Sequence, residues 1–538
     1  MPGRSCRFRR TPQCAVATWP LTRSASRIHR LCFDLEAIIR YKRFGYEERL
    51  RIAQHRRFGS SSERTASEQE PLPLLFDEAE LIADPKVEEP TTETITYTRR
   101  KAKGKRDQDL EDLPVERIEY RLPDEERTCA ECHGELHEMS TQVRRELQVI
   151  PAQVKVVEHV QVIYACRTCE REGVSTPIVT TKAPAPAIPG SLASPSALAH
   201  VMTQKFVEGL PLYRQEQHFE RLGIPLSRQT MANWMIESAE RWLVPLYDAM
   251  RQRLLQEEVL HADETTLQVL HEPDRSAKTQ SYMWVYRTGR DGPPIILFDY
   301  QPTRSGDHPK TFLSGFKGYL HVDGYSGYEG LSDVTLVGCW AHARRQFDEA
   351  IKALPSSARS KGPVTAEEGL DYCNRLYRAE RPLKGIDPKA RHAARQERSA
   401  PILNEFHAWL KKQEAEALPK SALGKAVRYC LNQWEKLTAF LKDGRLEIDN
   451  NRTERSIKPF VIGRKNWLFA NTPRGARSSA VIYSIIETAK ENGLHPFVYL
   501  THLFEQLPNS RLNDASLQAV MPWSDTLPAA CRLRPRKA

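Results

Sequence analysis

A block of short apolar runs between residues 257 and 347 constrains the fold of this chain more than any other feature. The runs are rich in Val, Ile, Leu and aromatic side chains and are bounded by charged or glycine-containing turns, which predicts strands. The expected strands cover residues 259–270, 282–287, 295–300, 318–322 and 335–339. A short helical stretch near residues 310–316 separates the third run from the fourth. The block therefore predicts one sheet interrupted by a helix.

The region after these strands has a different pattern. Residues 346–447 are largely helical and charged, without a strand signal, and a further helix follows at 448–470. Three successive strands, a helix and a further strand are what an RNase H-like α/β core requires. We therefore expect a multidomain α+β protein. Its RNase H-like core would comprise residues 257–345 and 448–470, with an all-helical insertion at 346–447 and a C-terminal helical region and tail at 471–538.

Three acidic residues occur where such a core would bring them together. Asp263 lies on the first expected strand, Asp323 at the end of the fourth, and Glu454 near a helix start with Asn as a capping candidate. Three convergent carboxylates can hold two Mg²⁺ or Mn²⁺ ions, which clamp the attacking and leaving oxygens of an in-line phosphoryl displacement. This combination predicts phosphodiester chemistry on DNA. Each acid alone has an ordinary explanation, since Asp forms turns after strands and Glu454 with Lys458 has the spacing of a solvated helix pair.

The composition is compatible with a nucleic-acid partner. The chain has 79 Lys and Arg against 69 Asp and Glu, a net charge of +10, and this excess favours a polyanion, although many basic proteins bind none. Its 538 residues exceed one core, so we expect roughly three to five domains. No apolar run is long enough for a membrane span, and residues 1–30 lack the apolar region of a signal peptide, so we expect a cytoplasmic protein.

Four cysteines have the spacing of a metal site. Two Cys-x-x-Cys pairs, separated by 33 residues, allow four thiolates to approach one tetrahedral Zn²⁺. The four cysteines are Cys129, Cys132, Cys166 and Cys169. We expect residues 111–181 to form a zinc ribbon with one structural Zn²⁺; free buried cysteines or a redox pair are the alternatives.

The rest of the N-terminal half divides into helices and linkers. Residues 1–63 form a basic segment followed by a helix at 31–58, and residues 64–110 and 182–196 are expected linkers. Within 197–256, a helix at 212–222, a turn with Gly223 and a helix from Ser227 are typical of helix-turn-helix. Arg228, Gln229 and Asn233 on the second helix suit base edges and phosphates, whereas ordinary helix packing is the alternative.

Several motifs follow one another along residues 55–505. Besides the paired cysteines they include Phe58-Gly-Ser-Ser-Ser-Glu63, His261-Ala-Asp-Glu-Thr265, His321-Val-Asp-Gly-Tyr325, Gly338-Cys-Trp-Ala-His-Ala-Arg-Arg345, Asp449-Asn-Asn-x-x-Glu454-Arg455 and Gly463-Arg-Lys-Asn-Trp467. In these motifs the chain resembles the DDE transposases of the insertion-sequence sixty-six type, large subunit. The chain differs from that family over residues 1–30, which lack the usual leucine-rich helix.

The resemblance implies roles for these residues. Asp263, Asp323 and Glu454 would form the DDE triad, and the zinc-finger and helix-turn-helix half would read the ends of the mobile element. Trp340, His342, Arg344 and Arg345 would hold the DNA backbone or stack on an extruded base. The alternative is a core tryptophan with solvated arginines. Arg452, Arg455 and Lys458 would balance the charge of the scissile phosphate.

The expected activity is DNA transposition. The enzyme would bind the inverted-repeat ends of its element, nick them to give 3′-hydroxyls and join these to target DNA. Pairing two ends implies a homodimer or larger assembly on double-stranded DNA, with possible small accessory proteins and a location at the bacterial nucleoid. Two other functions are compatible with the sequence: a catalytically silent, zinc-dependent DNA-binding repressor derived from a transposase, and a nuclease without strand transfer.

Overall fold

The computed structural model describes residues 46–54, 154–159, 163–165, 178–180, 183–355 and 364–533. The chain divides into two compact units. One comprises residues 1–61 and 182–538, and the other residues 62–181. In the second unit, β1 (Ile163–Ala165) and β2 (Ile178–Thr180) pair as an antiparallel hairpin. The central sheet and the helices around it belong to the first unit.

A five-stranded sheet forms the centre of this unit, in the order β5-β4-β3-β6-β7. Its strands are β3 (Val259–Gln268), β4 (Gln280–Thr288), β5 (Ile296–Gln301), β6 (Gly318–His321) and β7 (Val334–Val337). The first three pair antiparallel, whereas β6 and β7 run parallel to β3. The sheet is therefore mixed, with its first strand in the middle.

The expected strands are present with shifted ends. The first stops at Gln268 because the chain leaves the sheet there. Val269 and Leu270 pair with Ala470, and His271 N donates to Asn471 O, beyond the last turn of a helix nearly two hundred positions later. The fifth ends at Val337, and Cys339 caps the next helix instead of closing the strand. The helix expected at 310–316 is α9 (Asp307–Phe312).

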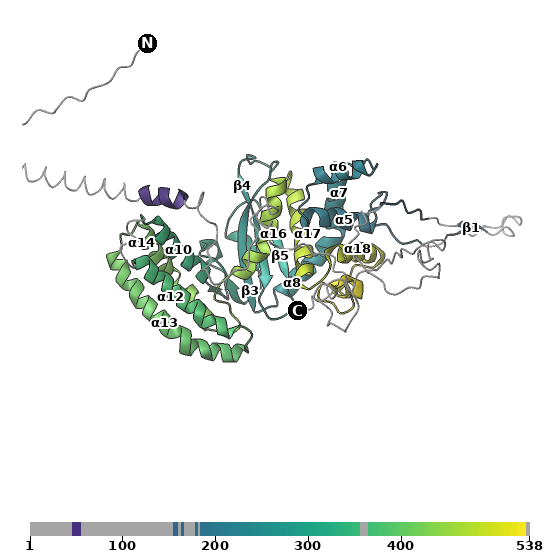
Figure 1. Cartoon of the computed structure of the whole chain (residues 1–538). Helices are drawn as coiled ribbons and strands as arrows, with labels where there is room; N and C mark the ends of the chain where they lie inside the picture. The colour runs from purple at the N-terminus through teal and green to yellow at the C-terminus, as the bar shows by residue number, and fades with distance from the viewer. Residues whose placement is uncertain are drawn as a thin grey trace, which may run out of the picture. The chain divides into compact units, whose positions relative to one another are not determined.

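Helices cover both faces of the sheet (Figure 1). Against the face that carries His261, Asp263 and Arg287 lies α16 (Asn451–Trp467), which contacts β3 and β4. On the opposite face the ring of Phe312 in α9 stacks on Tyr286, with centroids 3.9 Å apart. The two-sided cover explains why β4 and β5 are buried along most of their lengths.

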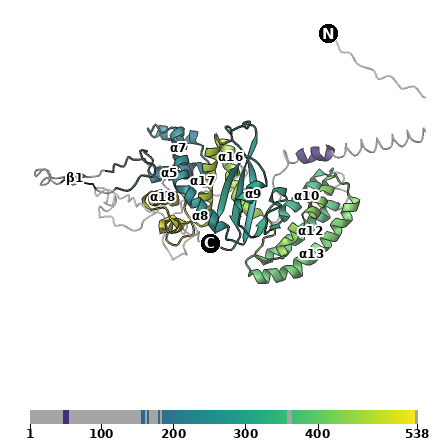
Figure 2. The same cartoon turned by 180° about the vertical axis from the view of Figure 1, so that it is seen from behind.

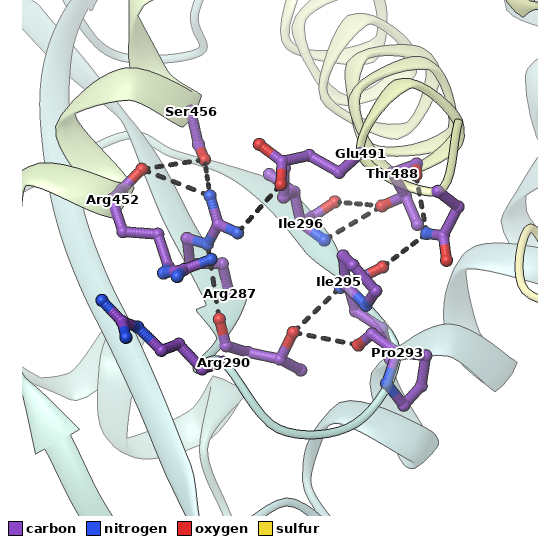
Figure 3. A network of polar contacts seen from close by, with 12 residues as sticks. Arg287, Arg290, Pro293, Ile295, Ile296, Arg452, Ser456, Thr488 and Glu491 are labelled. Carbon is purple, nitrogen blue, oxygen red and sulfur yellow. Dashed lines mark hydrogen bonds and ion pairs between the residues drawn. The ribbon is translucent and has the colours of Figure 1, made fainter. Parts of the chain in front are cut away.

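The outer edge of β5 is satisfied by a helix, α17 (Pro473–Glu491). Thr488 Oγ1 accepts from Ile296 N at 2.9 Å and donates to the oxygen of the same residue at 3.0 Å (Figure 3). Ser484 Oγ accepts from Phe298 N at 2.8 Å. Two helix hydroxyls thus take the place of a neighbouring strand at the first half of β5, and Tyr247 Oη donates to Phe298 O at 3.0 Å, so these edge groups are not free to pair with another chain.

Between β7 and α16 lies a group of helices (Figure 2), whose buried side chains build a second hydrophobic core. The helices are α10 (Trp340–Ala353), α12 (Thr365–Glu380), α13 (Pro388–Glu416), α14 (Ala422–Asn432) and α15 (Trp434–Thr438). The domain boundary predicted at residues 345–346 falls inside α10. Trp340 before it and Phe347 after it both pack in this second core.

Before the sheet, the expected helix pair is present as α6 (Leu212–Arg221) and α7 (Arg228–Ser238). Gly223 between them has a φ of +79°, and Ser227 Oγ caps α7 by accepting from Thr230 N. The neighbouring helices are α5 (Pro195–Phe206), a π-helical turn (Ala239–Leu243) and α8 (Val244–Leu254). Because α5 starts at Pro195, it includes the last residues of the linker predicted at 182–196.

The C-terminal part is helical, with α18 (Pro496–Gln506) and α19 (Asp514–Val520) after α17. Short 3-10 turns occur at Ser326–Tyr328, Arg381–Leu383, Ala439–Leu441, Leu507–Asn509 and Ala529–Cys531. Of the N-terminal helix expected at 31–58, residues 46–54 are described and are helical. None of the described helices combines the length and the apolar character that crossing a bilayer needs.

Candidate active site

Asp263 and Asp323 occupy matching positions on neighbouring parallel strands. The register pairs Val259 with Tyr319 and His261 with His321. Continued by two residues past the end of β6, the same register places Asp263 opposite Asp323. Backbone amides orient both side chains: Asp263 Oδ1 accepts from Glu264 N at 2.8 Å, and Asp323 Oδ1 from Tyr325 N at 2.9 Å. The two acids predicted from separate motifs therefore lie side by side at the end of the parallel strands.

Glu454 reaches the same face from the first turn of α16, and Asn450 fixes the start of that helix. Asn450 is 1% exposed. Its Nδ2 donates to Ala262 O at 2.9 Å, and its Oδ1 lies 2.9 Å from Nδ1 of His261. As expected, an Asn is the N-cap of the helix, but its side chain makes no cap hydrogen bond to the helix backbone. It is used instead to tie the helix to the strand that carries Asp263.

Two buried histidines stack on each other on the two strands that lead to the aspartates. His261 and His321, each two positions before an aspartate, stack with ring centroids 4.2 Å apart and an interplanar angle of 10°. Burial lowers the pKa of His261 to about 4 and that of His321 well below the usual value, so both rings are neutral at physiological pH. The stacked rings join β3 to β6, and because both are neutral they add no charge near Asp263 and Asp323.

A buried arginine holds α16 against the sheet. Arg287 faces His261 across β3 and β4 and is 1% exposed. Its Nη1 donates to Arg452 O at 3.2 Å and to the hydroxyl of Ser456, and its Nη2 lies 3.4 Å from Glu491 Oε2 (Figure 3). Burial lowers the pKa of Arg287 to about 10, which leaves it charged at neutral pH. This residue was not predicted, because a lone arginine in a strand has no sequence signal for its partners.

The carboxylates near Asp263 are close enough for their charges to act on it. Burial raises the pKa of Asp263 well above its usual range, and the nearby charges of Glu264, Asp323 and Glu454 raise it further. A group of acids whose charges oppose one another in a desolvated site is the donor set that divalent oxygen-seeking cations neutralise. Carboxylates of this kind suit a divalent metal ion, but the ligand atoms of Asp263, Asp323 and Glu454 are not gathered within 4.8 Å of one another; among the described residues that holds for Cys339, His342 and Glu454.

Glu264 is a further acid that sequence reasoning did not single out. Its carboxylate accepts from Tyr328 Oη at 2.7 Å and forms an ion pair with Arg304, whose guanidinium lies 3.9 Å from the centroid of the Tyr325 ring. These contacts tie the loop after Asp323 to β3. Through these contacts Glu264 positions the loop.

His342 lies beside Glu454, with 4.0 Å between Nε2 and Oε1. Cys339 Sγ completes a group of three whose potential ligand atoms lie within 4.8 Å of one another. Burial raises the pKa of the Cys339 thiol to about 12, and the sulfur already accepts from Asn450 N at 3.2 Å. Cys339 is therefore a protonated packing partner, whereas the half-exposed His342 faces the site.

Trp340 corrects an expectation. It is 0% exposed, packs in the second core and donates from Nε1 to Leu437 O at 2.8 Å. A side chain held in this way cannot stack on an extruded base, so the core alternative is right. Arg344 and Arg345 are half-buried on the same helix, and Arg344 donates from Nε to Asn374 Oδ1 at 3.0 Å.

The cations near Glu454 differ in availability. Arg452 forms an ion pair with Glu447, with 3.1 Å between Nη2 and Oε1. Arg455 and Lys458 are exposed on α16. On α7, Arg228, Gln229 and Asn233 are also exposed, and the main chain of Arg228 bonds the carboxylate of Glu216.

The predicted zinc ligands, Cys129, Cys132, Cys166 and Cys169, lie outside the described residues. Their geometry therefore stays a prediction.

Comparisons with known proteins give a consistent result. The family model described as "Transposase IS66 family" matches residues 190–478, and the "zinc-finger binding domain of transposase IS66" matches residues 126–170. Residues 484–523 match the "IS66 C-terminal element", and residues 45–118 match "Transposase C of IS166 homeodomain". The zinc-finger match contains all four predicted ligands, and the last match includes the segment predicted as a linker at 64–110.

Similar proteins occur in Sinorhizobium fredii strain NBRC 101917 / NGR234. The uncharacterized protein y4jD is 33% identical over 422 residues, which cover 76% of this chain and 80% of the relative. The uncharacterized protein y4hP is 31% identical over 491 residues, which cover 86% of each. The similarity thus extends over most of both chains.

Proposed function

The chain belongs to the IS66 family of transposases, and from this premise we propose that it cleaves the ends of its mobile element and joins them to target DNA. The family makes it a transposase-type enzyme with a zinc-finger domain and DNA as its partner. The identity of the catalytic residues and the reaction that they carry out are our proposal. We propose in addition that the mixed sheet with its first strand in the middle is an RNase H-like core.

One observation carries the proposal: three acids from distant parts of the chain share one place. In support, the register of β3 and β6, continued two residues past the end of β6, brings Asp323 opposite Asp263, and the charges of Asp323 and Glu454 both act on Asp263. Such convergence has no structural use, because like charges in a desolvated site oppose folding. It is expected where the acids must hold cations for a reaction.

Divalent ions bound there, Mg²⁺ or Mn²⁺, would supply Lewis-acid activation of water and neutralise charge on the scissile phosphate. Asp263, Asp323 and Glu454 would hold them. His261 and His321 would keep the two aspartates in register, and Asn450 would set the position of Glu454. His342, whose Nε2 is 4.0 Å from Glu454 Oε1, would contact the nucleophile or the phosphate. Arg455 and Lys458 would bind the phosphates that flank the cleaved bond.

The zinc finger and the exposed face of α7 are proposed to read the element ends. Arg228, Gln229 and Asn233 on α7 are exposed and of the types that contact base edges and phosphates. One structural Zn²⁺ at the four cysteines would fold the finger. Because two ends must be joined together, we propose a homodimer or larger assembly on DNA, aided by small accessory proteins.

The test is a nicking and joining assay with Mg²⁺ or Mn²⁺ on DNA that carries the inverted repeats flanking the gene. Wild type should release 3′-hydroxyl ends and join them to a target, whereas Glu454→Gln should lose activity about 100-fold or more. Glu435→Gln, which removes an exposed acid of α15, is the matched control and should behave as wild type.

Other outcomes select other functions. Cleavage without joined products would identify a nuclease. Specific binding without cleavage, even with accessory proteins present, would identify a DNA-binding repressor. Equal activity of Glu454→Gln and wild type would remove Glu454 from the site.

A further inference from the structure

The exposed face of α16 continues from the candidate active site to the far end of the helix. At about 100° per residue, Glu454, Lys458 and Lys465 lie within about 40° of one another around the axis, and Arg455 and Ile462 lie within about 100° of Glu454. Of these five residues all but the half-buried Glu454 are exposed; Val461, about 20° from Glu454 around the axis, is half-buried. Glu454 is also the only acid of the helix, which carries five Lys and Arg.

The cations of this face are not used to hold the fold together. Within the described part of the chain, Arg455, Lys458 and Lys465 have no ion-pair or hydrogen-bond partner, unlike Arg452, which forms an ion pair, and Arg464, which forms hydrogen bonds. Arg452 pairs with Glu447, and Arg464 donates from Nη1 to Thr266 Oγ1 at 3.0 Å. The inward arginines are structural, and the outward cations remain available to an anionic ligand.

The face ends in a strained apolar turn. Leu468 has φ 66° and ψ −47°, and Phe469 N donates to Trp467 O at 2.8 Å. This is the rare γ-turn with positive φ at its centre, a conformation that a leucine adopts only under strain. Leu468 is nevertheless 65% exposed and Phe469 42% exposed. Neither the backbone geometry nor burial explains a large apolar side chain here.

The turn is fixed on both sides. Ala470 N donates to Gln268 O at 2.9 Å, which attaches the chain to the end of β3. Asn466 Nδ2 donates to Gly209 O at 3.0 Å, and Lys205 Nζ lies 4.0 Å from the centroid of the Trp467 ring. The two exposed apolar side chains are therefore presented from a braced position.

We propose that this face guides the DNA strand that runs from the scissile phosphate, and that Leu468 and Phe469 stack against a base at its end. The inference rests on the proposed function. Glu454 and Leu468 are 14 residues apart, about 21 Å along a helix, and the axial rise of DNA is about 3.4 Å per nucleotide, so the base lies roughly six nucleotides from the cleaved bond.

Charge and chemistry favour DNA over a protein partner. A row of free cations beginning at the phosphoryl-transfer site suits phosphates, and apolar side chains at a fixed turn suit the faces of unstacked bases. An apolar protein partner would need a wider apolar surface than Leu468, Phe469 and Ile462 offer.

The first test uses the full chain and element-end DNA with 2-aminopurine at each of about eight positions beside the scissile phosphate. Wild-type protein should raise the fluorescence of one position near the sixth nucleotide. Phe469→Ala and Leu468→Gly should abolish this rise and weaken end binding about 5- to 100-fold. Leu512→Ala, which removes another exposed apolar side chain, is the control.

Leu468→Gly separates function from folding. Glycine adopts positive φ without strain, so the melting temperature of the Leu468→Gly variant should equal or exceed that of wild type. A variant that is as stable as wild type but fails in the fluorescence assay supports the proposal. A normal fluorescence rise in both variants overturns it.

The second test measures the salt dependence of end binding. The slope of log K against log salt is negative, and each lost phosphate contact reduces its magnitude by about 0.9, so Lys458→Ala with Lys465→Ala should make the slope less steep by about 2. Lys412→Ala, on an exposed position of α13, should leave the slope unchanged. An unchanged slope in the double variant overturns the phosphate track.

The outcomes also distinguish this inference from the proposed function. If wild type neither binds nor cleaves the ends, the proposed function fails. If wild type cleaves and joins normally while all these variants match it, only the role of the α16 face fails.

Discussion

Asn450 is the side chain through which the helix of the third acid is attached to the strand of the first. Its amide joins Ala262 and His261 on β3 to the first turn of α16, where Thr453 Oγ1 donates to its Oδ1 at 3.0 Å. The sequence indicated a capping Asn from its place before a helix. It could not show that the partners lie 188 and 189 positions earlier.

We predict that Asn450→Ala lowers the free energy of unfolding by about 2–3 kcal/mol, because buried groups on both elements lose their partners. It should also raise the Mn²⁺ concentration needed for half-maximal cleavage, since Glu454 is no longer held. Urea unfolding and a metal titration of cleavage check both effects. Asn432→Ala, on an exposed position of α14, is the control. A variant with normal metal dependence would show that Asn450 does not position Glu454.

Asp263 gives a prediction on pH. Burial and the charges of Glu264 and Asp323 raise its pKa in the folded protein. A carboxyl with a raised folded pKa binds its proton more tightly when folded, so the metal-free protein loses stability as pH rises from about 4 through that folded pKa.

Asp263→Asn removes this loss. We expect the metal-free variant to melt about 2–5 °C above wild type at pH 7, and no higher than wild type below about pH 4. Mn²⁺ should raise the melting temperature of wild type but not of the variant. Asp525→Asn, at a fully exposed position, should match wild type at every pH. If wild type were the more stable at pH 7 without metal, the destabilising effect of burial and like-charge repulsion on the ionised Asp263 would be contradicted.

At the scale of elements, local pattern predicted what each segment is but not all of its partners. The strands of the sheet and the pair α6 and α7 follow from apolar runs, Gly223 and the cap Ser227. The edge cover of β5 does not, because Ser484 and Thr488 are ordinary hydroxyls in a helix and their bonds to the strand span about 190 residues. Trp340 was ambiguous for the same reason: burial depends on distant helices.

The edge cover itself is testable. Ser484→Ala with Thr488→Val should lower the free energy of unfolding by about 2–6 kcal/mol, since two buried backbone N–H groups lose their acceptors. The variant should also aggregate more readily as the edge of β5 becomes free. Urea unfolding and light scattering measure these effects. Thr501→Val, whose hydroxyl bonds only within α18, is the control, and equal stability of both variants would contradict the role of α17.

At the scale of the whole molecule, the family connects parts that the described residues do not. The zinc-finger match covers Cys129, Cys132, Cys166 and Cys169, and we predict one zinc ion per chain in protein purified without chelator. Cys166→Ser should lose the zinc and weaken end binding while joining of precleaved, concentrated DNA persists. Metal analysis of both proteins checks this, with Cys531→Ala as the control. Full zinc content in Cys166→Ser would exclude that ligand.

The central claim is that Asp263, Asp323 and Glu454 act as one catalytic site. The most direct measurement is the rate of strand transfer from a precleaved 3′-hydroxyl end in Mg²⁺, for wild type and for Asp263→Asn, Asp323→Asn and Glu454→Gln. We predict joining by wild type and a loss of about 100-fold or more in each variant, with end binding within about threefold of wild type. Joining at the wild-type rate by any one variant would contradict the claim.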